Sequence, residues 1–245
     1  SFRYSYYKDL RVFTKANVFL TGDIEAVREY MLENTQLINV DFDYVGICDA
    51  EGTMYTSTGE EVDVSSKDFF NQILTKGADE YISNPNEDRV PGGNVFYVTV
   101  SAVNENGNVF GIFVGAIPTT IAENEIGRIK LSGDGYVFAL DGSGTILALR
   151  DSEEVGQNYY EMGDDASGLI GYYKVADDMI YGKEGSGIVK NKNTGKTNYM
   201  FYSPIYGTSW SLGVAIPEVE IQAGAKKSGI AIALITSIIA ILLLV

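Results

Sequence analysis

Histidine is absent from this sequence of 245 residues, and cysteine and tryptophan each occur only once. Without histidine the chain has no Ser-His-Asp or Cys-His catalysis, no imidazole metal ligand and no imidazole pH switch. The single cysteine, Cys48, excludes an intrachain disulfide and a zinc site built from several thiolates. We therefore expect no enzymatic activity from this fragment, no bound metal and no cofactor.

Basic residues are also scarce, because 18 Lys and Arg stand against 33 Asp and Glu, which gives a formal net charge of -15 at pH 7. A surface that binds nucleic acid needs clustered Lys and Arg to neutralise phosphates, so a nucleic-acid partner is not expected. The hydrophobic content of 45% is typical of a packed globular protein, and the length suits one large domain or two of ordinary size. The expected partner is a small molecule or another protein.

The C-terminal segment 228–245 contains no charged residue, Asn, Gln or Pro. At about 1.5 Å of rise per residue, a helix of this length approaches the thickness of a bilayer's hydrocarbon core. A buried core helix is the alternative, but such a helix normally carries a polar stripe. We expect the start of a transmembrane helix. Since the chain also begins with Ser1 instead of Met, we expect it to be a piece of a longer protein.

An internal repeat is the most informative feature of the sequence. Residues 44–54, Tyr-Val-Gly-Ile-Cys-Asp-Ala-Glu-Gly-Thr-Met, are echoed at 136–146 by Tyr-Val-Phe-Ala-Leu-Asp-Gly-Ser-Gly-Thr-Ile. Both segments read as a strand, a turn that opens with Asp and closes with Gly, and a second strand. A second echo joins residues 114–118 to residues 213–217, where each predicted strand ends in proline. The chain therefore contains two copies of one module, each an antiparallel sheet backed by helices.

Apolar residues recur at spacings of three and four along the first forty residues, which predicts one long N-terminal helix over residues 1–39 with a kink near Gly22. Its apolar stripe suits either its own domain's core or a dimer seam. We divide the rest into a first module at 40–126, a second at 127–217 and a connecting helix with the start of the membrane span at 218–245. The fold class is α+β.

The first module contains a short predicted helix with unusual chemistry at its start. Ser65 and Asp68 fit a capping box, and Gly77 suits the position after the helix. Lys67 then falls in the first turn, where the helix dipole does not favour a cation. Either Lys67 is simply solvated or an anion lies nearby. Because the adjacent Phe69 and Phe70 cannot both enter the same core, one of them could line a cavity.

The order of these features resembles the double Cache extracellular sensor domain of bacterial transmembrane receptors, and the resemblance covers essentially the whole chain. It rests on the hairpin, the Ser-Ser-Lys-Asp-Phe-Phe helix start at 65–70, two long strands and the second copy of the module. It implies two tandem PAS-like modules on a long N-terminal helix, followed by a transmembrane helix. It also implies ligand capture in the membrane-distal first module, an extracytoplasmic location and a homodimer in the full-length receptor. Any histidine kinase, diguanylate cyclase or chemoreceptor output module would lie beyond Val245.

The resemblance also assigns roles to individual positions. Lys67 matches the basic residue that holds a ligand carboxylate in many members, and the aromatics that follow it match Phe69 and Phe70. Members that bind amino acids place an Asp for the ammonium group where this chain has Ala116, and Pro85 stands about where a Tyr is expected. A small carboxylate is therefore a more suitable ligand than an α-amino acid.

The strand at 95–101 supplies further candidates. Alternation places an apolar set on one face and the hydroxyl groups of Tyr97, Thr99 and Ser101 on the other. A half-exposed strand shows the same pattern, but beneath a pocket this face could supply the few polar groups that orient a ligand. Tyr55 and Tyr81 are the other residues expected in the wall.

Two other functions remain open at this point. One is a membrane-anchored surface or adhesive protein without a small ligand, and the other is a hydrolase that uses paired carboxylates. The Asp-Gly-Ser-Gly-Thr string at 141–145 does not favour the hydrolase, because the same hairpin in the first copy identifies it as a turn. The paired acids at 164–165 and 177–178 read as solvated charge, not as metal ligands.

Overall fold

The computed structural model describes residues 2–87, 94–129, 131, 133–149, 153–162 and 168–225. The chain forms two compact units, residues 1–119 and 120–245. The expected membrane segment at 228–245 lies outside the described residues. Among the helices that are described, none is both long and apolar enough to cross a membrane.

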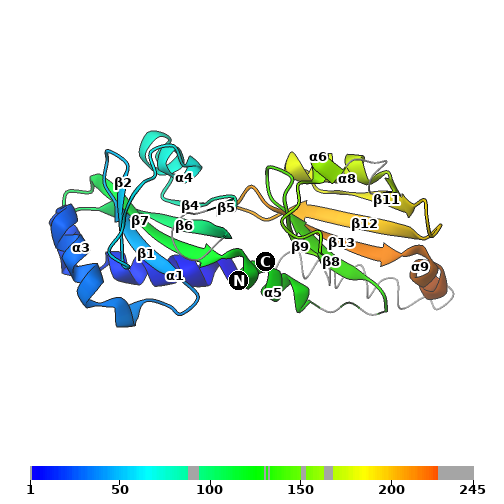
Figure 1. Cartoon of the computed structure of the whole chain (residues 1–245), viewed down its shortest axis with the longest axis horizontal. Coiled ribbons are helices and arrows are strands. Elements are labelled where there is room, and N and C mark those ends of the chain that lie inside the picture. The colour runs from blue at the N-terminus through cyan, green and yellow to red at the C-terminus, as the bar shows by residue number, and fades with distance from the viewer. Residues whose placement is uncertain are drawn as a thin grey trace. The chain divides into compact units, whose positions relative to one another are not determined.

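The first unit opens with three short helices, α1 (Phe2–Thr14), α2 (Asn17–Leu20) and α3 (Ile24–Glu33), and a 3-10 turn, η1 (Thr35–Leu37) (Figure 1). The prediction of one long helix over residues 1–39 is therefore wrong. Ala16 takes an extended conformation between α1 and α2 and so separates the two helices. The predicted kink is a full break, since Gly22 has a φ of 72° and Asp23 accepts hydrogen bonds from the amides of Glu25 and Ala26, which starts α3.

The sheet of the first unit is antiparallel and has the order β3-β2-β1-β7-β6-β4, with β5 also paired to β6. Its strands are β1 (Tyr44–Cys48), β2 (Thr53–Thr56), β3 (Glu61–Asp63), β4 (Glu80–Ile82), β5 (Asn86–Glu87), β6 (Asn94–Val103) and β7 (Val109–Pro118). The three central strands are buried along almost their whole length because both faces of the sheet are covered.

The helices α1 to α3 cover one face of this sheet. Phe13 of α1 stacks on Phe113 of β7 with ring centroids 5.4 Å apart, and Phe19 of α2 meets the same ring edge-on at 5.5 Å. Gly115 of β7 lies directly against the ring of Phe42, where a Cβ atom would overlap that ring. A short helix, α4 (Asp68–Phe70), and a π-helical turn, η2 (Asn71–Thr75), lie on the opposite face (Figure 1).

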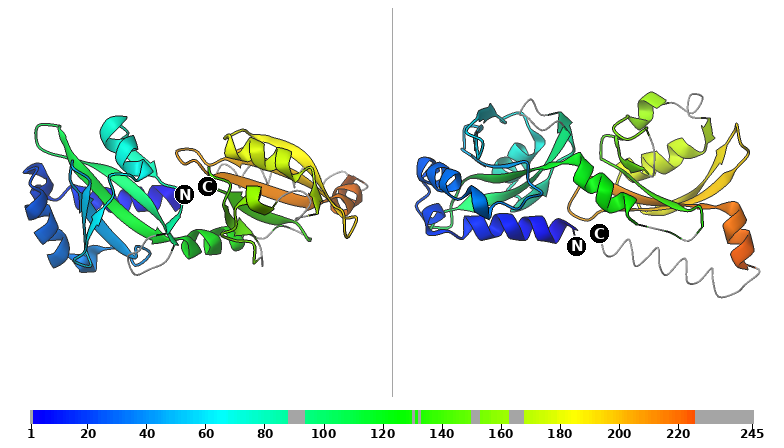
Figure 2. Two further views of the ribbon diagram at one scale, coloured as in Figure 1. Left: turned by 45° about the horizontal axis from the view of Figure 1, so that its top comes forward. Right: turned by 60° about the horizontal axis from the view of Figure 1, so that its bottom comes forward.

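The second unit repeats the arrangement of the first. It contains α5 (Thr119–Gly127), β8 (Tyr136–Leu140), β9 (Ile146–Leu149), α6 (Tyr159–Met162), β10 (Leu169–Ile170), α8 (Tyr172–Ile180), β11 (Gly185–Asn191), β12 (Thr197–Pro204), β13 (Ser211–Pro217) and α9 (Glu218–Ala225). Its antiparallel sheet has the order β10-β11-β12-β13-β8-β9. The strand orders β2-β1-β7-β6 and β9-β8-β13-β12 are thus equivalent. Figure 2 shows that each unit consists of a sheet with helices packed against it.

The two repeated hairpin turns are built by the same chemistry. Asp49 accepts hydrogen bonds from the amides of Glu51 and Thr53, and Asp141 accepts them from the amides of Ser143 and Thr145. An aspartate side chain that holds the backbone of its own turn is a local structural device. The string at 141–145 is therefore a turn, as its repeat predicts.

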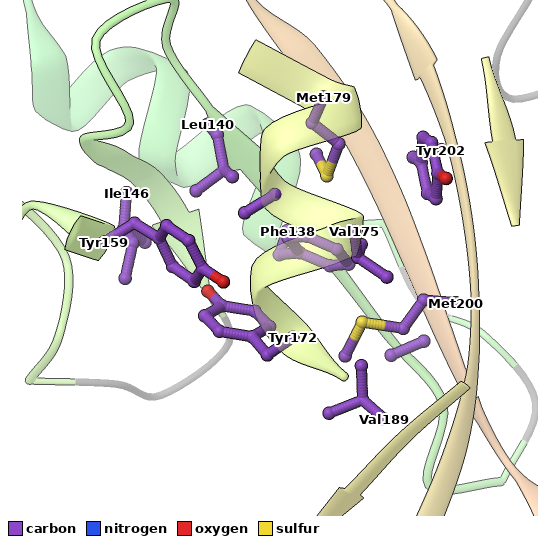
Figure 3. Packing of buried hydrophobic residues seen from close by; sticks show 12 residues of the cluster. Phe138, Leu140, Ile146, Tyr159, Tyr172, Val175, Met179, Val189, Met200 and Tyr202 are labelled. Carbon is purple, nitrogen blue, oxygen red and sulfur yellow. The ribbon is translucent and has the colours of Figure 1, made fainter. Parts of the chain in front are cut away.

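The core of the second unit lies between α8 and the sheet. Figure 3 shows α8, which carries Val175 and Met179, lying over the strands that carry Phe138 and Met200, with Tyr159 and Tyr172 at one end of the cluster. Gly187 of β11 allows this approach, because a Cβ atom there would meet a Cγ atom of Val175.

Candidate functional site

The register of the first sheet brings three residues into one row. Two of them, Ala116 and Tyr97, are predicted site residues, and the third, Tyr44, was not predicted. Tyr44 of β1 pairs with Ala116 of β7, and Ala116 pairs with Tyr97 of β6. Side chains of directly opposed residues share a face of the sheet. All three belong to the buried cluster beneath α4 and η2, so they face these elements and not the N-terminal helices.

The two tyrosines of this row meet above Ala116. Their hydroxyl oxygens are 3.0 Å apart, and either can donate to the other. Both side chains are buried, with exposed fractions of 2% for Tyr44 and 0% for Tyr97. The contact requires a small residue between them, since a longer side chain at position 116 would project into the space that the hydroxyl groups occupy.

The α4 segment closes this face of the sheet. Phe69 is fully buried and meets the ring of Tyr97 edge-on, with centroids 5.0 Å apart. Phe70 is only half-buried, although it packs on the same cluster. The two phenylalanines thus have different environments, as their adjacency requires.

Lys67 lies immediately before α4 and not in its first turn, because the helix begins at Asp68. The predicted capping box is absent, since Ser65 donates its hydroxyl to Asp63 at 2.7 Å and Asp68 accepts from the amide of Phe69. Gly77 does follow the segment with a φ of 72°, as predicted. Lys67 is half-buried, and among the described residues no acidic side chain forms an ion pair with it.

Tyr81 joins this group from the edge strand β4. Its hydroxyl donates to Asp68 at 3.1 Å, which ties α4 to the sheet. Burial, followed by the negative charge of Asp68 and this hydrogen bond, raises the pKa of Tyr81 well above its usual value. Tyr81 therefore stays protonated at neutral pH and keeps the proton that it donates to Asp68.

Thr99 and Ser101 are buried on the same strand as Tyr97. The Thr99 hydroxyl donates to the backbone carbonyl of Tyr81 at 3.0 Å. Ser101 pairs with Ile112, two rows away from Tyr97. The Thr99 bond therefore ties β6 to the edge strand β4, and because both residues are buried the hydroxyl-bearing face is not half-exposed.

Tyr55 does not join the other candidates. It pairs with Ile47, on the face that α3 covers, and the guanidinium of Arg28 from α3 lies 4.8 Å from its ring centroid. Alternation along β2 explains why Tyr55 lies on this face. Neighbouring side chains of a strand point to opposite faces, and the adjacent Met54 points into the cluster beneath α4. We therefore remove Tyr55 from the predicted wall.

Sequence reasoning missed Tyr44, which begins the first repeat and has Tyr136 as its counterpart in the second. The repeat could have indicated it, because both copies open with tyrosine opposite the strand that ends in Ala-Ile-Pro. Cys48 also belongs to the cluster. Burial, reinforced by Asp49 and Asp63, raises the pKa of its thiol to about 12, so it is not a nucleophile.

Comparison with known proteins agrees with this architecture. The sequence pattern of the Cache domain family matches residues 1–225. Similar solved structures include the extracellular domain mmHK1S-Z3, which is assigned to a histidine kinase (18% identity, TM-score 0.66, covering 92% of each chain). The ligand-binding domain of Mlp24 with asparagine is 14% identical, with a TM-score of 0.62, covering 91% of this chain and 88% of that one.

A third similar structure is the ligand-binding domain of the Pseudomonas fluorescens chemoreceptor CtaA in complex with L-serine. It is 16% identical, with a TM-score of 0.60, and the match covers 89% of this chain and 91% of that one. No curated protein shows significant sequence similarity to the chain. At these identities the solved structures establish the shared fold.

Proposed function

The chain belongs to the Cache domain family, and from that premise we propose that it is the extracytoplasmic ligand-binding region of a membrane receptor. The similarity to extracellular domains of histidine kinases and chemoreceptors supports this role. In this proposal the first unit binds a small carboxylate, and the segment 228–245 anchors the region to the membrane. A homodimer in the full-length receptor is part of the same proposal.

The observation that carries the ligand class is the row formed by Tyr44, Ala116 and Tyr97. An ammonium group buried in this site would need a carboxylate partner, because an unpaired buried charge is costly. The row offers two phenol hydroxyls above a methyl group instead. Lys67 supplies positive charge at the start of the segment that covers the row. A carboxylate without an amine suits this combination of a cation and hydroxyl donors.

The α4 segment is the element that a ligand would move. Phe69 fills the space against Tyr97, so a ligand must displace this segment to reach the hydroxyl pair. The bond from Tyr81 to Asp68 favours the closed arrangement. A ligand that binds the displaced arrangement 100-fold more tightly would shift the equilibrium by about 2.7 kcal/mol, which is sufficient for a signal.

Propionate and L-alanine form a matched pair of probes, because they differ only by the α-ammonium group. We expect propionate to raise the melting temperature of the chain and L-alanine to have no effect. Lys67→Ala should abolish the response while leaving the free energy of unfolding without ligand within about 1 kcal/mol of the wild type. Lys76→Ala is the control, since Lys76 is an exposed lysine at the other end of the same segment.

Stabilisation by L-alanine but not by propionate would overturn the proposed ligand class. An equal loss of response in the Lys67 and Lys76 variants would overturn the role of Lys67, because both variants remove one positive charge from the segment.

A further inference from the structure

The edge strand β4 contacts the helical layers on both faces of the first sheet. Neighbouring side chains of a strand point to opposite faces. Tyr81 accordingly donates to Asp68 of α4 at 3.1 Å, and the carboxylate of the adjacent Glu80 lies 3.4 Å from Nε of Arg11 in α1. Two consecutive residues of one short strand therefore join α4 on one face to α1 on the other (Figure 1).

Arg11 also holds the backbone where β4 begins. Its Nη2 donates to the carbonyl of Asp79 at 2.9 Å, and its Nη1 donates to the carbonyl of Ser101 in β6 at 3.3 Å. The carbonyl of Asp79 also accepts a hydrogen bond from the amide of Ser101 at 3.0 Å. The planar fork of donors in a guanidinium group suits such multiple contacts. Arg11 thus fastens α1 to two neighbouring strands at once.

The strand β4 is short and lies at an edge of the sheet. It has three residues, and within the described part of the chain it pairs only with β6. The hydroxyl of Thr99 adds one hydrogen bond to the carbonyl of Tyr81. An edge strand lacks ladder partners on its outer side, so side-chain contacts contribute more to its position than they do in a central strand. A change in the contact with α1 should therefore reach the contact with α4.

We propose that β4 couples the position of α4 to that of α1, with Tyr81 and Arg11 as the positioning residues at the two ends of the link. Displacement of α4 breaks the bond between Tyr81 and Asp68, which leaves β4 less firmly held and loosens the attachment of α1 through Arg11. Because a coupling free energy is reciprocal, loosening Arg11 favours displacement of α4 to the same extent. Only the ligand that displaces α4 rests on the proposed function, since the link itself exists without ligand.

Hydrogen exchange of the intact chain without ligand, followed by mass spectrometry, tests this link. We expect Arg11→Gln to raise the exchange rate of the amides in α4 and η2 about threefold, although its hydrogen bonds are to β4 and β6. Tyr81→Phe should raise exchange in α1 by a similar factor. The amides of β7 are the reference for unfolding of the whole sheet, because β7 is a buried central strand.

The double variant separates a link through β4 from general destabilisation. In the Tyr81→Phe background, Arg11→Gln should have no further effect on α4 and η2, because the connection through which it acts is already broken. Asp9→Ala is the matched control for Arg11→Gln. Asp9 holds α1 through a hydrogen bond from Asn39 at 2.6 Å, in the segment before β1. This control should speed exchange in α1 and leave α4 and η2 unchanged.

Unchanged exchange of α4 and η2 in Arg11→Gln would overturn the proposal, as would equal effects of Arg11→Gln and Asp9→Ala on these elements. An effect of Arg11→Gln that persists in full beside Tyr81→Phe would also overturn it. Because Tyr81→Phe removes only a hydroxyl group, its effect on α1 tests the link even where Arg11→Gln lowers the stability of the whole unit.

Propionate binding to Arg11→Gln connects the link to the proposed ligand face. We expect this variant to bind propionate about threefold more tightly than the wild type, since the displaced arrangement of α4 costs less free energy in it. If propionate does not bind the wild type, the proposed ligand is wrong, but the exchange experiment without ligand still decides whether β4 couples the two elements. The two proposals therefore fail separately.

Discussion

At the scale of single residues, the small side chain of Ala116 shapes the buried face beneath α4. Its methyl group leaves room for the hydroxyls of Tyr44 and Tyr97 to meet at 3.0 Å. An acidic residue in the same place would separate these hydroxyls and bury a charge. The small side chain at position 116 therefore leaves a neutral sheet face, lined by two hydroxyl groups, beneath α4.

The hydroxyl pair should contribute measurably to stability. In a double-mutant cycle of Tyr44→Phe and Tyr97→Phe, we expect a coupling energy of about 1 kcal/mol, because each single variant leaves the other buried hydroxyl without this partner. Urea unfolding of the wild type, the two single variants and the double variant measures this coupling energy. Thr99→Val is a useful comparison, since Thr99 bonds to a backbone carbonyl instead. Strictly additive effects of the two Phe substitutions would show that the contact does not stabilise the fold.

At the scale of elements, α8 is fastened to the second sheet through Asp178. This carboxylate accepts hydrogen bonds from Lys174 of the same helix, from Lys183 at 3.0 Å and from the hydroxyl of Tyr202 in β12 at 2.8 Å. The hydrogen bonds of Lys174, Lys183 and Tyr202 hold the pKa of Asp178 well below its usual range. Of the paired acids at 177–178, Asp178 is thus part of the packing of α8 on the sheet.

This anchor predicts a specific pH dependence. An aspartate titrates near pH 4 in an unfolded chain, and its pKa is lower in the folded chain, so the stabilisation is present above about pH 4 and is lost as the pH falls through the folded value. Asp178→Asn should lower the melting temperature at pH 7, and the difference from the wild type should shrink steadily below pH 4.

Asp177→Asn is the matched control for this experiment, because Asp177 bonds to the hydroxyl of the exposed Tyr160 and does not link α8 to the sheet. A difference between the wild type and Asp178→Asn that stays constant from pH 7 to pH 2 would contradict the role of the ionised carboxylate.

Helix packing decides how exposed each sheet face is. In the first unit, α4 covers the face proposed to bind the carboxylate with the buried Phe69, and it leaves Phe70 half-buried. In the second unit, α8 leaves Tyr136 and Tyr173 half-buried. The same sheet arrangement therefore supports one closed face and one more open face, according to the helix above it.

At the scale of the whole molecule, the net charge of -15 is the dominant feature. Carboxylates that repel one another across the surface destabilise a compact chain, and salt reduces this repulsion. Raising the ionic strength from about 0.01 M to 0.15 M shortens the Debye length from about 30 to 8 Å. We expect the melting temperature to rise by roughly 2–4 °C, which corresponds to about 1 kcal/mol for a chain of this size.

Differential scanning calorimetry at pH 7 measures this shift. The same titration near pH 4.3, the isoelectric point of the sequence, is the control and should show little change. A fall in melting temperature with salt at pH 7 would indicate that attractive ion pairs outweigh the repulsion.

Much of the fold could be predicted from local patterns. The two long strands expected in the first module are present as β6 and β7. An Asn-Gly turn joins them, where Asn104 accepts hydrogen bonds from the amides of Asn106 and Asn108. The N-terminal helices are harder to predict, because the apolar stripe continues through Ala16 and Gly22. The sequence predicts a kink near Gly22, but only the backbone conformation shows the break at Ala16.

The sequence alone determined the two-module architecture, the acidic surface and the exclusion of histidine chemistry, because these depend on composition and on a local pattern that occurs twice in the chain. Tertiary structure decided which tyrosines meet. Tyr55 and Tyr97 are equally plausible wall residues by sequence, yet one lies under Arg28 and the other meets Tyr44, 53 residues away. Alternation along a strand defines two faces, but only pairing with distant strands decides which helix covers each face.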